Sequence, residues 1–328
     1  MPFDQGGIKM KPLLQTVDLK KYFPQGKRIL KAVDGISIEI KEGETLGLVG
    51  ESGCGKSTLG RTILKLLRPD GGKIFFEGKD ITNLNDKEMK PYRKKMQIIF
   101  QDPLGSLNPQ MTVGRIIEDP LIIHKIGTKK ERRKRVEELL DMVGIGREFI
   151  NSFPHEFSGG QQQRIGIARA LALNPKFIVC DEPVSALDVS IQAQIIDLLE
   201  EIQQKMGISY LFIAHNLAVV EHISHKVAVM YLGKIVEYGD VDKIFLNPIH
   251  PYTRALLKSV PKIPWDGQKQ RFYSLKGELP SPIDLPKGCR FQTRCTEKKA
   301  ICFEKEPELT EVEKNHFVSC HLVRSYRG

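Results

Sequence analysis

The feature that most constrains this chain is a glycine-rich loop set between an apolar segment and a segment with helical periodicity. Residues 50–57 read Gly-Glu-Ser-Gly-Cys-Gly-Lys-Ser, which fits the phosphate-binding pattern G-x-x-x-x-G-K-[S/T]. Residues 45–50 predict a short buried strand and residues 57–67 a helix, which is the setting that this loop requires. Such a loop turns backbone N–H groups toward phosphates at a helix N-terminus. The sequence therefore predicts a site for a nucleoside triphosphate.

Individual roles follow from the chemistry of the loop. We expect the Lys56 ammonium to reach the β- and γ-phosphates and the Ser57 hydroxyl to ligate Mg²⁺. Cys54 stands at a variable position and is interpreted as a packing residue rather than a redox-sensitive thiol. The predicted nucleotide contacts in this stretch are Gly50, Ser52, Gly53, Gly55, Lys56, Ser57 and Thr58.

Strand-like and helix-like segments alternate along the chain, which predicts a mainly parallel α/β sheet. Further strands are expected at 72–78, 96–101, 177–180 and 210–214, and a helix at 190–207 that stops at Gly207. Residues from about 103 to 170 predict an inserted helical subdomain. Proline becomes frequent between residues 248 and 286, which indicates a second domain, so we expect domains at 1–245 and 246–328.

Composition narrows the class of protein. The chain has 328 residues and a net charge of +10, which permits contact with nucleic acid or an anionic membrane surface. Its densest basic run, residues 129–135, contains no aromatic residue for base stacking, so we interpret it as a solvated helix face. We find neither an apolar run long enough for a bilayer nor the layout of a signal peptide, and we expect a cytosolic protein.

Polar residues that follow predicted strands supply candidates for catalysis. Asp181 and Glu182 end the strand at 177–180, where the first carboxylate can hold Mg²⁺ and the second can polarise an attacking water. Gln101 can touch Mg²⁺ and this water, and His215 can hydrogen-bond a γ-phosphate. Each residue alone also fits an ordinary structural role: a loop start, a strand end or a satisfied side chain. Their occurrence in order with a phosphate-binding loop favours the functional interpretation.

Over residues ~12–245 this ordered set resembles the ATP-binding cassette family, a branch of the P-loop NTPases. The carrying motifs are the P-loop, Gln101, Ser158-Gly-Gly-Gln161, Asp181-Glu182, Ser185-Ala-Leu-Asp188 and His215. The resemblance implies a nucleotide-binding domain with an inserted helical subdomain and an antiparallel β subdomain. It also implies ATP and Mg²⁺ as cofactors and an ATP site shared between two subunits.

The family's residue roles carry over position by position. Tyr22 resembles the aromatic that stacks on adenine, with Phe23 as the alternative, and Asp188 resembles the D-loop residue. Ser158, Gly159, Gly160 and Gln161 match the signature that caps ATP held by the opposite subunit. Two positions depart from the common pattern, Phe157 for Leu and Asn216 for Asp, and neither carries the chemistry.

Two runs, residues 48–64 and 244–261, are similar to the ATPases of oligopeptide and dipeptide importers, and more to their F-type subunit than to its D-type partner. The resemblance implies peptide import energised at the cytoplasmic face of the cell membrane by a peripheral subunit. Implied partners are a D-type ATPase subunit, two transmembrane permease subunits and, indirectly, an extracytoplasmic peptide-binding protein. No nucleic acid is expected. The alternative is a soluble cassette ATPase that acts on nucleic acid or ribosomes.

The last forty residues hold four of the six cysteines, Cys289, Cys295, Cys302 and Cys320. Disulfides suit secreted domains rather than a cytosolic chain. Structural zinc sites usually contain cysteine pairs two to four residues apart, whereas five, six and seventeen residues separate these cysteines. Iron–sulfur clusters accept open spacings, and unligated cysteines remain a third alternative. Some peptide-importer ATPases carry a 4Fe–4S cluster in this extension, so the resemblance implies a small Cys-rich C-terminal domain with a cluster, Zn²⁺ being the alternative.

Overall fold

The computed structural model describes residues 11–259 and 280–325. The chain divides into two compact units. The first comprises the residues up to 39, 46–82 and those from 214 onward, and contains the P-loop and the C-terminal extension. The second comprises residues 40–45 and 83–213.

The first unit contains two groups of strands. In one, β2 (Arg28–Ile36), β1 (Leu14–Gln25), β5 (Gly71–Phe76) and β6 (Lys79–Asp80) pair antiparallel in that order. This sheet confirms the expected antiparallel β element. The second group has the order β12 (Thr310–Glu313), β13 (His316–Val318), β11 (Lys234–Asp240), β10 (Lys226–Tyr231) and β4 (Thr45–Val49). Only β10 and β4 run parallel in this group, and the short β3 (Glu39–Ile40) precedes β4.

The helices of the first unit are short. They are α1 (Lys56–Ile63), α8 (Leu217–Ile223), α9 (Val241–Leu246), α10 (Pro251–Lys258), α11 (Ile301–Glu304) and the 3₁₀ turn η3 (His321–Ser325). The predicted helix at 57–67 ends earlier than expected. The N–H of Leu66 donates to the carbonyl oxygen of Arg61, and Lys65 takes a left-handed φ of 55°, which closes the helix in a Schellman-type turn. Residues 260 and 261, the end of the run that resembles peptide-importer ATPases, lie outside the described residues.

The second unit is built on three parallel strands in the order β9 (Ser209–Ile213), β8 (Phe177–Asp181) and β7 (Met96–Ile99). All residues of β8 and β9 are buried, as expected for apolar strands of a parallel sheet. Helix α7 (Val189–Met206) buries Ile195, Leu198 and Ile202 and ends at Gly207, whose φ is 65°. The predicted strands and the predicted helix stop are therefore confirmed.

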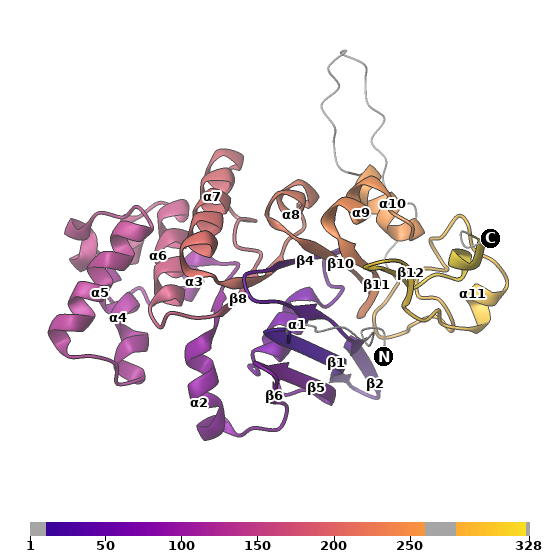
Figure 1. Cartoon of the computed structure of the whole chain (residues 1–328), viewed down its shortest axis with the longest axis horizontal. Coiled ribbons are helices and arrows are strands. Elements are labelled where there is room, and N and C mark those ends of the chain that lie inside the picture. Colours follow the sequence, from indigo (N-terminus) through magenta and orange to yellow (C-terminus); the bar gives the residue numbers. More distant parts are fainter. Residues whose placement is uncertain (1–10, 260–279, 326–328) are drawn as a thin grey trace, which may run out of the picture. The chain divides into compact units, whose positions relative to one another are not determined.

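Residues 103–171 are largely helical, in agreement with the predicted insertion, and α4, α5 and α6 lie together in Figure 1. The elements are α3 (Pro103–Ser106), α4 (Val113–Ile123), α5 (Lys129–Met142), η1 (Arg147–Asn151), η2 (Pro154–Glu156) and α6 (Gly159–Leu171), preceded by α2 (Asp86–Lys95). The basic run 129–135 begins α5, where Arg133 pairs with Glu137 and Lys134 with Glu138 at the surface. This arrangement confirms a solvated helix face.

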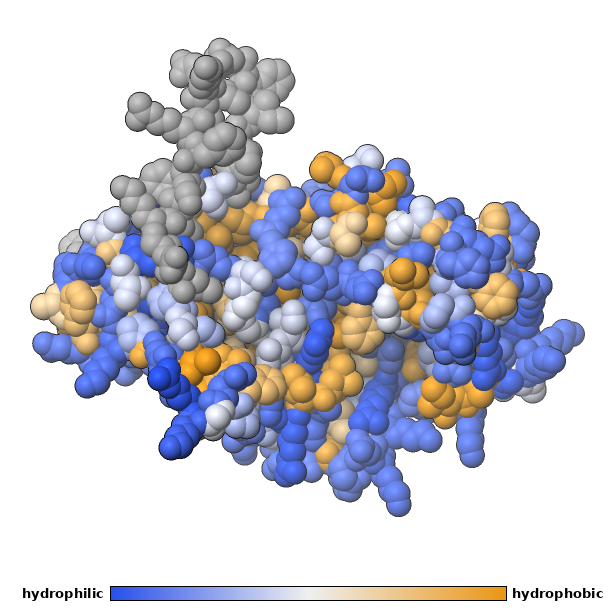
Figure 2. All heavy atoms as spheres, turned by 180° about the vertical axis from the view of Figure 1, so that it is seen from behind, coloured by the Kyte–Doolittle hydropathy of each residue, from blue (hydrophilic) through white to orange (hydrophobic). Residues whose placement is uncertain are grey.

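The face of the molecule in Figure 2 is mostly hydrophilic, with hydrophobic side chains in scattered patches. Among the described residues no helix is long and apolar enough to cross a membrane.

Candidate nucleotide-binding site

The P-loop follows β4 and takes a backbone path that only glycine can follow at two positions. Gly50 and Gly55 have φ of 153° and 108°. A Cβ atom at Gly50 would lie 2.2 Å from the carbonyl oxygen of Met230, and one at Gly55 would lie 2.0 Å from that of Ala32. The loop is therefore held tightly against backbone from two other segments, which fixes the direction of its N–H groups.

Lys56 begins α1 and curls back over the loop. Its side chain is buried, and its ammonium donates to the carbonyl oxygens of Gly50 at 2.8 Å and Glu51 at 3.1 Å. The ammonium group thus already lies within the loop that the sequence predicts to bind phosphates. Cys54 is buried beside it, and burial raises the pKa of its thiol to about 11, which fits a packing residue that stays protonated.

Glu51, at a variable position of the P-loop, is fixed by two side chains of the C-terminal extension. Its carboxylate accepts hydrogen bonds from both terminal nitrogens of Arg294, at 2.6 and 3.0 Å. Its backbone N–H donates to the hydroxyl of Tyr252 at 2.9 Å. Arg294 is almost fully buried, with 4% of its side chain exposed. Sequence reasoning missed this ion pair, because no local pattern relates residues 243 positions apart.

Tyr22 in β1 is anchored in a similar way. Its hydroxyl donates to Oδ1 of Asp34 at 2.5 Å, and Oδ2 of the same carboxylate pairs with Arg290. Burial raises the pKa of Asp34, but the hydrogen bonds from Tyr22 and Arg290 outweigh it and lower the pKa overall. Burial and the bond to Asp34 raise the pKa of Tyr22. Phe23, the alternative aromatic, lies under the Lys21 ammonium at 5.3 Å from the ring centroid.

His215 belongs to the same unit as the P-loop. It follows Ala214, whose N–H donates to the carbonyl oxygen of Leu48 in β4 at 3.3 Å. His215 therefore lies near the carboxyl end of β4, where the P-loop also begins, and it is exposed. The structure thus places His215 and the P-loop at the same end of β4.

In the second unit, Gln101 and the two candidate carboxylates follow neighbouring parallel strands. Ile99 of β7 pairs in register with Cys180 of β8, so the residues after them lie at one edge of the sheet. Asp181 and Glu182 are buried at 1% and 6% exposure, while Gln101 is exposed. Glu182 takes a left-handed φ of 51°, and its N–H donates to the carbonyl oxygen of Ile213 at 3.0 Å. A strained backbone at a buried carboxylate is typical of a functional position, and no local sequence pattern indicates this conformation.

The predicted signature residues begin α6. Ser158 and Gln161 form a capping box: the Ser158 hydroxyl accepts from the Gln161 N–H at 3.4 Å, and the Gln161 amide oxygen accepts from the Ser158 N–H at 3.0 Å. Ser158 and Gly159 are exposed at this N-terminus. A Cβ at Gly160 would lie 2.6 Å from Cγ2 of Ile191, so this glycine lets α6 and α7 approach closely. Asp188 is exposed at the N-cap of α7 and makes no capping bond with its side chain.

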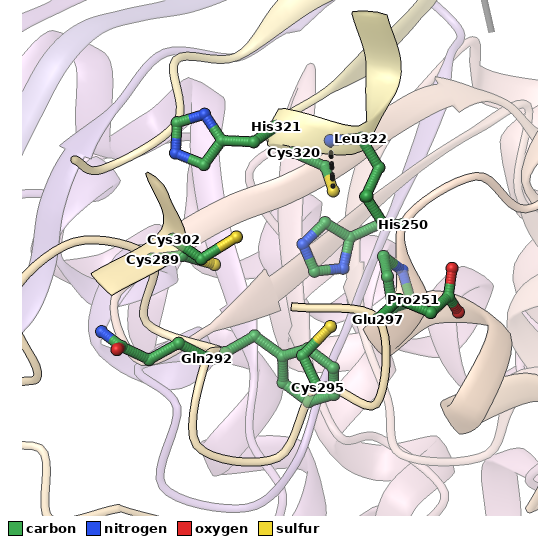
Figure 3. Close-up of a pocket in the computed structure, with 11 residues that line it drawn as sticks. His250, Pro251, Cys289, Gln292, Cys295, Glu297, Cys302, Cys320, His321 and Leu322 are labelled. Carbon is green, nitrogen blue, oxygen red and sulfur yellow. Dashed lines mark hydrogen bonds between the residues drawn. The ribbon is translucent and has the colours of Figure 1, made fainter. Parts of the chain in front are cut away.

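The four C-terminal cysteines line one pocket in the first unit, together with His250, Phe291 and His321 among others. Figure 3 shows their side chains around a common space, reached from separate segments of the extension. All four are free thiols. Burial raises the pKa of Cys289 to about 12, that of Cys320 to about 11 and that of Cys295 above its ordinary value. Backbone N–H groups of Lys299 and Leu322 donate to the sulfurs of Cys302 and Cys320.

Two family models match the chain. Residues 33–185 match one described as ABC transporter, and residues 236–302 match one described as Oligopeptide/dipeptide transporter, C-terminal region. The Oligopeptide transport ATP-binding protein AppF of Bacillus subtilis (strain 168) is 54% identical over 319 residues, covering 94% of this chain and 97% of the relative. The Dipeptide transport ATP-binding protein DppF of Escherichia coli (strain K12) is 47% identical over 325 residues, covering 97% of each.

Solved structures of ATP-binding cassettes are also similar. A dimeric structure of MJ0796, bound to ADP and Pi in a post-hydrolysis state, matches with a TM-score of 0.64 and 32% identity over 70% of this chain and 98% of that one. CbiO1 from Clostridium perfringens, part of the transporter complex cbiONQ, matches with a TM-score of 0.65 and 30% identity, over 73% and 92%.

Proposed function

Given that the chain belongs to the family of ATP-binding subunits of oligopeptide and dipeptide ABC transporters, we propose that it hydrolyses ATP to energise peptide import. The observation that carries the proposal is the occurrence, in one chain, of a preformed P-loop and the peptide-transporter C-terminal region. The relatives are transport proteins, so the alternative of a soluble ATPase acting on nucleic acid or ribosomes is not favoured.

The catalytic roles are assigned residue by residue. Lys56 binds the β- and γ-phosphates; Ser57 and Asp181 would hold Mg²⁺ with help from Gln101, and the ion would supply positive charge to the phosphates. Glu182 polarises the attacking water. His215 hydrogen-bonds the γ-phosphate and orients the water. The burial of Glu182 and its strained backbone support this role, because both hold a carboxylate in one orientation. Tyr22 stacks on adenine, and its anchored hydroxyl supports it over Phe23.

The ATP site is completed by a second ATPase subunit of the D type. Ser158, Gly159 and Gly160 face the γ-phosphate of nucleotide bound by that subunit, and Asp188 lies at the shared interface. The exposed N-terminus of a capped 13-residue helix supports this, since such a terminus attracts anionic groups.

Exposed apolar side chains support a docking surface for transmembrane permease subunits. Leu104, Phe149 and Phe153, in the helical part of the second unit, are 52%, 43% and 37% exposed. Leu104 is three residues after Gln101, and Phe153 is five residues before Ser158, so docking and nucleotide residues share short segments. In this assignment the chain is a peripheral subunit at the cytoplasmic face of the membrane, fed indirectly by an extracytoplasmic peptide-binding protein.

We also propose that Cys289, Cys295, Cys302 and Cys320 hold a 4Fe–4S cluster in a small Cys-rich C-terminal module. Four free thiols around one pocket fit a metal group bound by cysteine sulfurs, and two of these sulfurs accept hydrogen bonds from backbone N–H groups. Such a cluster would supply cross-links between segments of the extension and a redox-active centre.

The function is tested by reconstitution in vesicles with the permease subunits and the partner ATPase. We expect peptide-stimulated ATP hydrolysis and peptide uptake, both lost with Lys56→Ala. Phe153→Glu should prevent co-purification with the permeases but leave ATP binding intact, and Leu246→Glu, at a leucine in the other unit that is 81% exposed, serves as the control. Hydrolysis that responds to DNA or ribosomes and not to peptide would contradict the proposal.

A further inference from the structure

The segment from Cys289 to Cys295 carries two arginines that are used inside the protein rather than at its surface. Arg290 is 7% exposed and Arg294 has 4% of its side chain exposed. The N–H of Cys295 donates to the carbonyl oxygen of Phe291 at 2.9 Å, so the segment forms a turn. Phe291 lies between the two arginines, and its ring centroid is 5.3 Å from that of Tyr231 and 5.4 Å from that of Tyr252. These ring contacts fix the turn in place.

Arg290 is fully engaged. Its Nη1 donates to the carbonyl oxygen of Leu232, its Nε to Glu306 at 2.9 Å, and its Nη2 to Asp34. The Asp34 N–H donates to the carbonyl oxygen of Gly233 at 2.9 Å, so backbone and carboxylate are both held. The other oxygen of this buried carboxylate accepts the Tyr22 hydroxyl. Arg290 therefore sets the position of Asp34, and Asp34 sets the position of the Tyr22 ring.

Arg294 reaches a different part of the nucleotide site. Its two terminal nitrogens hold the Glu51 carboxylate in a forked ion pair. The carbonyl oxygen of Glu51 in turn accepts the Lys56 ammonium at 3.1 Å. Arg294 thus touches the P-loop through the residue that also orients its lysine.

We propose that Arg290 and Arg294 are positioning residues through which the cysteine-bearing segment sets nucleotide affinity: Arg290 acts on adenine through Asp34 and Tyr22, and Arg294 acts on the phosphates through Glu51. The inference rests on the proposed function, because it uses Tyr22 as the adenine contact and Lys56 as the phosphate contact. It does not depend on a metal group bound in the cysteine pocket.

Two ligands separate the routes: ATP, which has a base, and inorganic tripolyphosphate, which has none. Their dissociation constants are measured with Mg²⁺ by isothermal titration calorimetry on the full chain. Arg290→Lys should weaken ATP binding roughly tenfold, the order expected for loss of one aromatic stack, and leave tripolyphosphate binding unchanged. Arg294→Lys should weaken both ligands by a similar factor. Lysine keeps the charge in each case but loses the fork.

Tyr22→Phe removes only the anchored hydroxyl, and it should reproduce the base-selective loss of Arg290→Lys. The double variant should be no weaker than either single variant, because both break one chain of contacts. The matched control is Arg254→Lys. Through one terminal nitrogen, Nη2, Arg254 donates to both carboxylate oxygens of Glu297, at 2.7 and 2.8 Å, and Glu297 lies two residues after Cys295. This replacement should change neither constant.

The outcomes are distinguishable. If Tyr22→Ala leaves the ratio of ATP to tripolyphosphate affinity unchanged, the assignment of Tyr22 to adenine fails, and with it the adenine route. If Tyr22→Ala lowers that ratio and Arg290→Lys does not, the positioning role of Arg290 is overturned. Equal weakening of both ligands by Arg290→Lys, or by the Arg254→Lys control, would indicate a general structural effect and would also overturn it.

Discussion

Glu237 in β11 is a buried carboxyl group that holds several parts of the first unit together. It is fully buried, and its carboxylate accepts the N–H groups of Ile249 at 2.8 Å and His250 at 3.0 Å. His316 in β13 approaches the same carboxylate at 2.8 Å through Nε2. One side chain thus joins β11, the start of α10 and β13.

Replacement of Glu237 by Leu would leave two backbone N–H groups and one imidazole nitrogen buried without this acceptor. Each unsatisfied donor costs about 1–3 kcal/mol, and removal of one partner from a buried charged network costs about 3–5 kcal/mol in measured cases. We expect a loss of about 4 kcal/mol in the free energy of unfolding. For a unit of this size that lowers the melting temperature by roughly 8–16 °C.

Differential scanning calorimetry of the full chain measures this shift. Glu237→Gln keeps one acceptor oxygen and should lower the melting temperature by a clearly smaller amount. Glu313→Gln is the control, because Glu313 lies near the same histidine but 57% of its side chain is exposed. A shift for Glu237→Leu no larger than that of the control would refute the reasoning.

Three further predictions concern the ATP site and the cysteines. Glu182→Gln should retain ATP binding and slow hydrolysis by ~10²-fold or more, measured as phosphate release, since it removes a positioned general base; hydrolysis at the unaltered rate would contradict that role. The isolated chain should hydrolyse ATP slowly, with activity rising when the partner ATPase and permeases are added, and Ser158→Arg should abolish the rise; full turnover by a monomer would contradict a shared site. Anaerobically purified protein should be brown, with absorbance near ~400 nm and about four irons per chain, and replacement of any one of the four cysteines, unlike replacement of Cys54, should remove the metal; a colourless protein with one zinc would refute the cluster.

Local patterns predicted the local structure well. The strand–loop–helix setting of the P-loop and the stop of α7 at Gly207 depend on residues within a few positions of each other, and both are confirmed. The end of α1 was predicted wrongly, because the apolar periodicity continues beyond the residue at which the backbone turns.

The contacts around the candidate site were beyond sequence reasoning. Arg290 and Asp34 are 256 positions apart, and Arg294 and Glu51 are 243 apart, so no period or motif relates them. Glu182, whose N–H donates to the carbonyl oxygen of Ile213 in the neighbouring strand, has a left-handed backbone that no local pattern indicates. The nucleotide, cluster and partner assignments stay predictions.

The pairing of β13 with β11 also protects the protein from association with other chains. A strand at the edge of a sheet presents unpaired N–H and C=O groups that can template pairing with a second molecule. Residues 237–239 of β11 are paired by β13, and β12 lies outside β13. In a chain that ended after residue 245, β11 would be an unpaired edge strand, and its residues that are now buried would be exposed. The extension therefore covers an edge strand that could pair with other molecules. Its loss should cause aggregation before it lowers ATP hydrolysis.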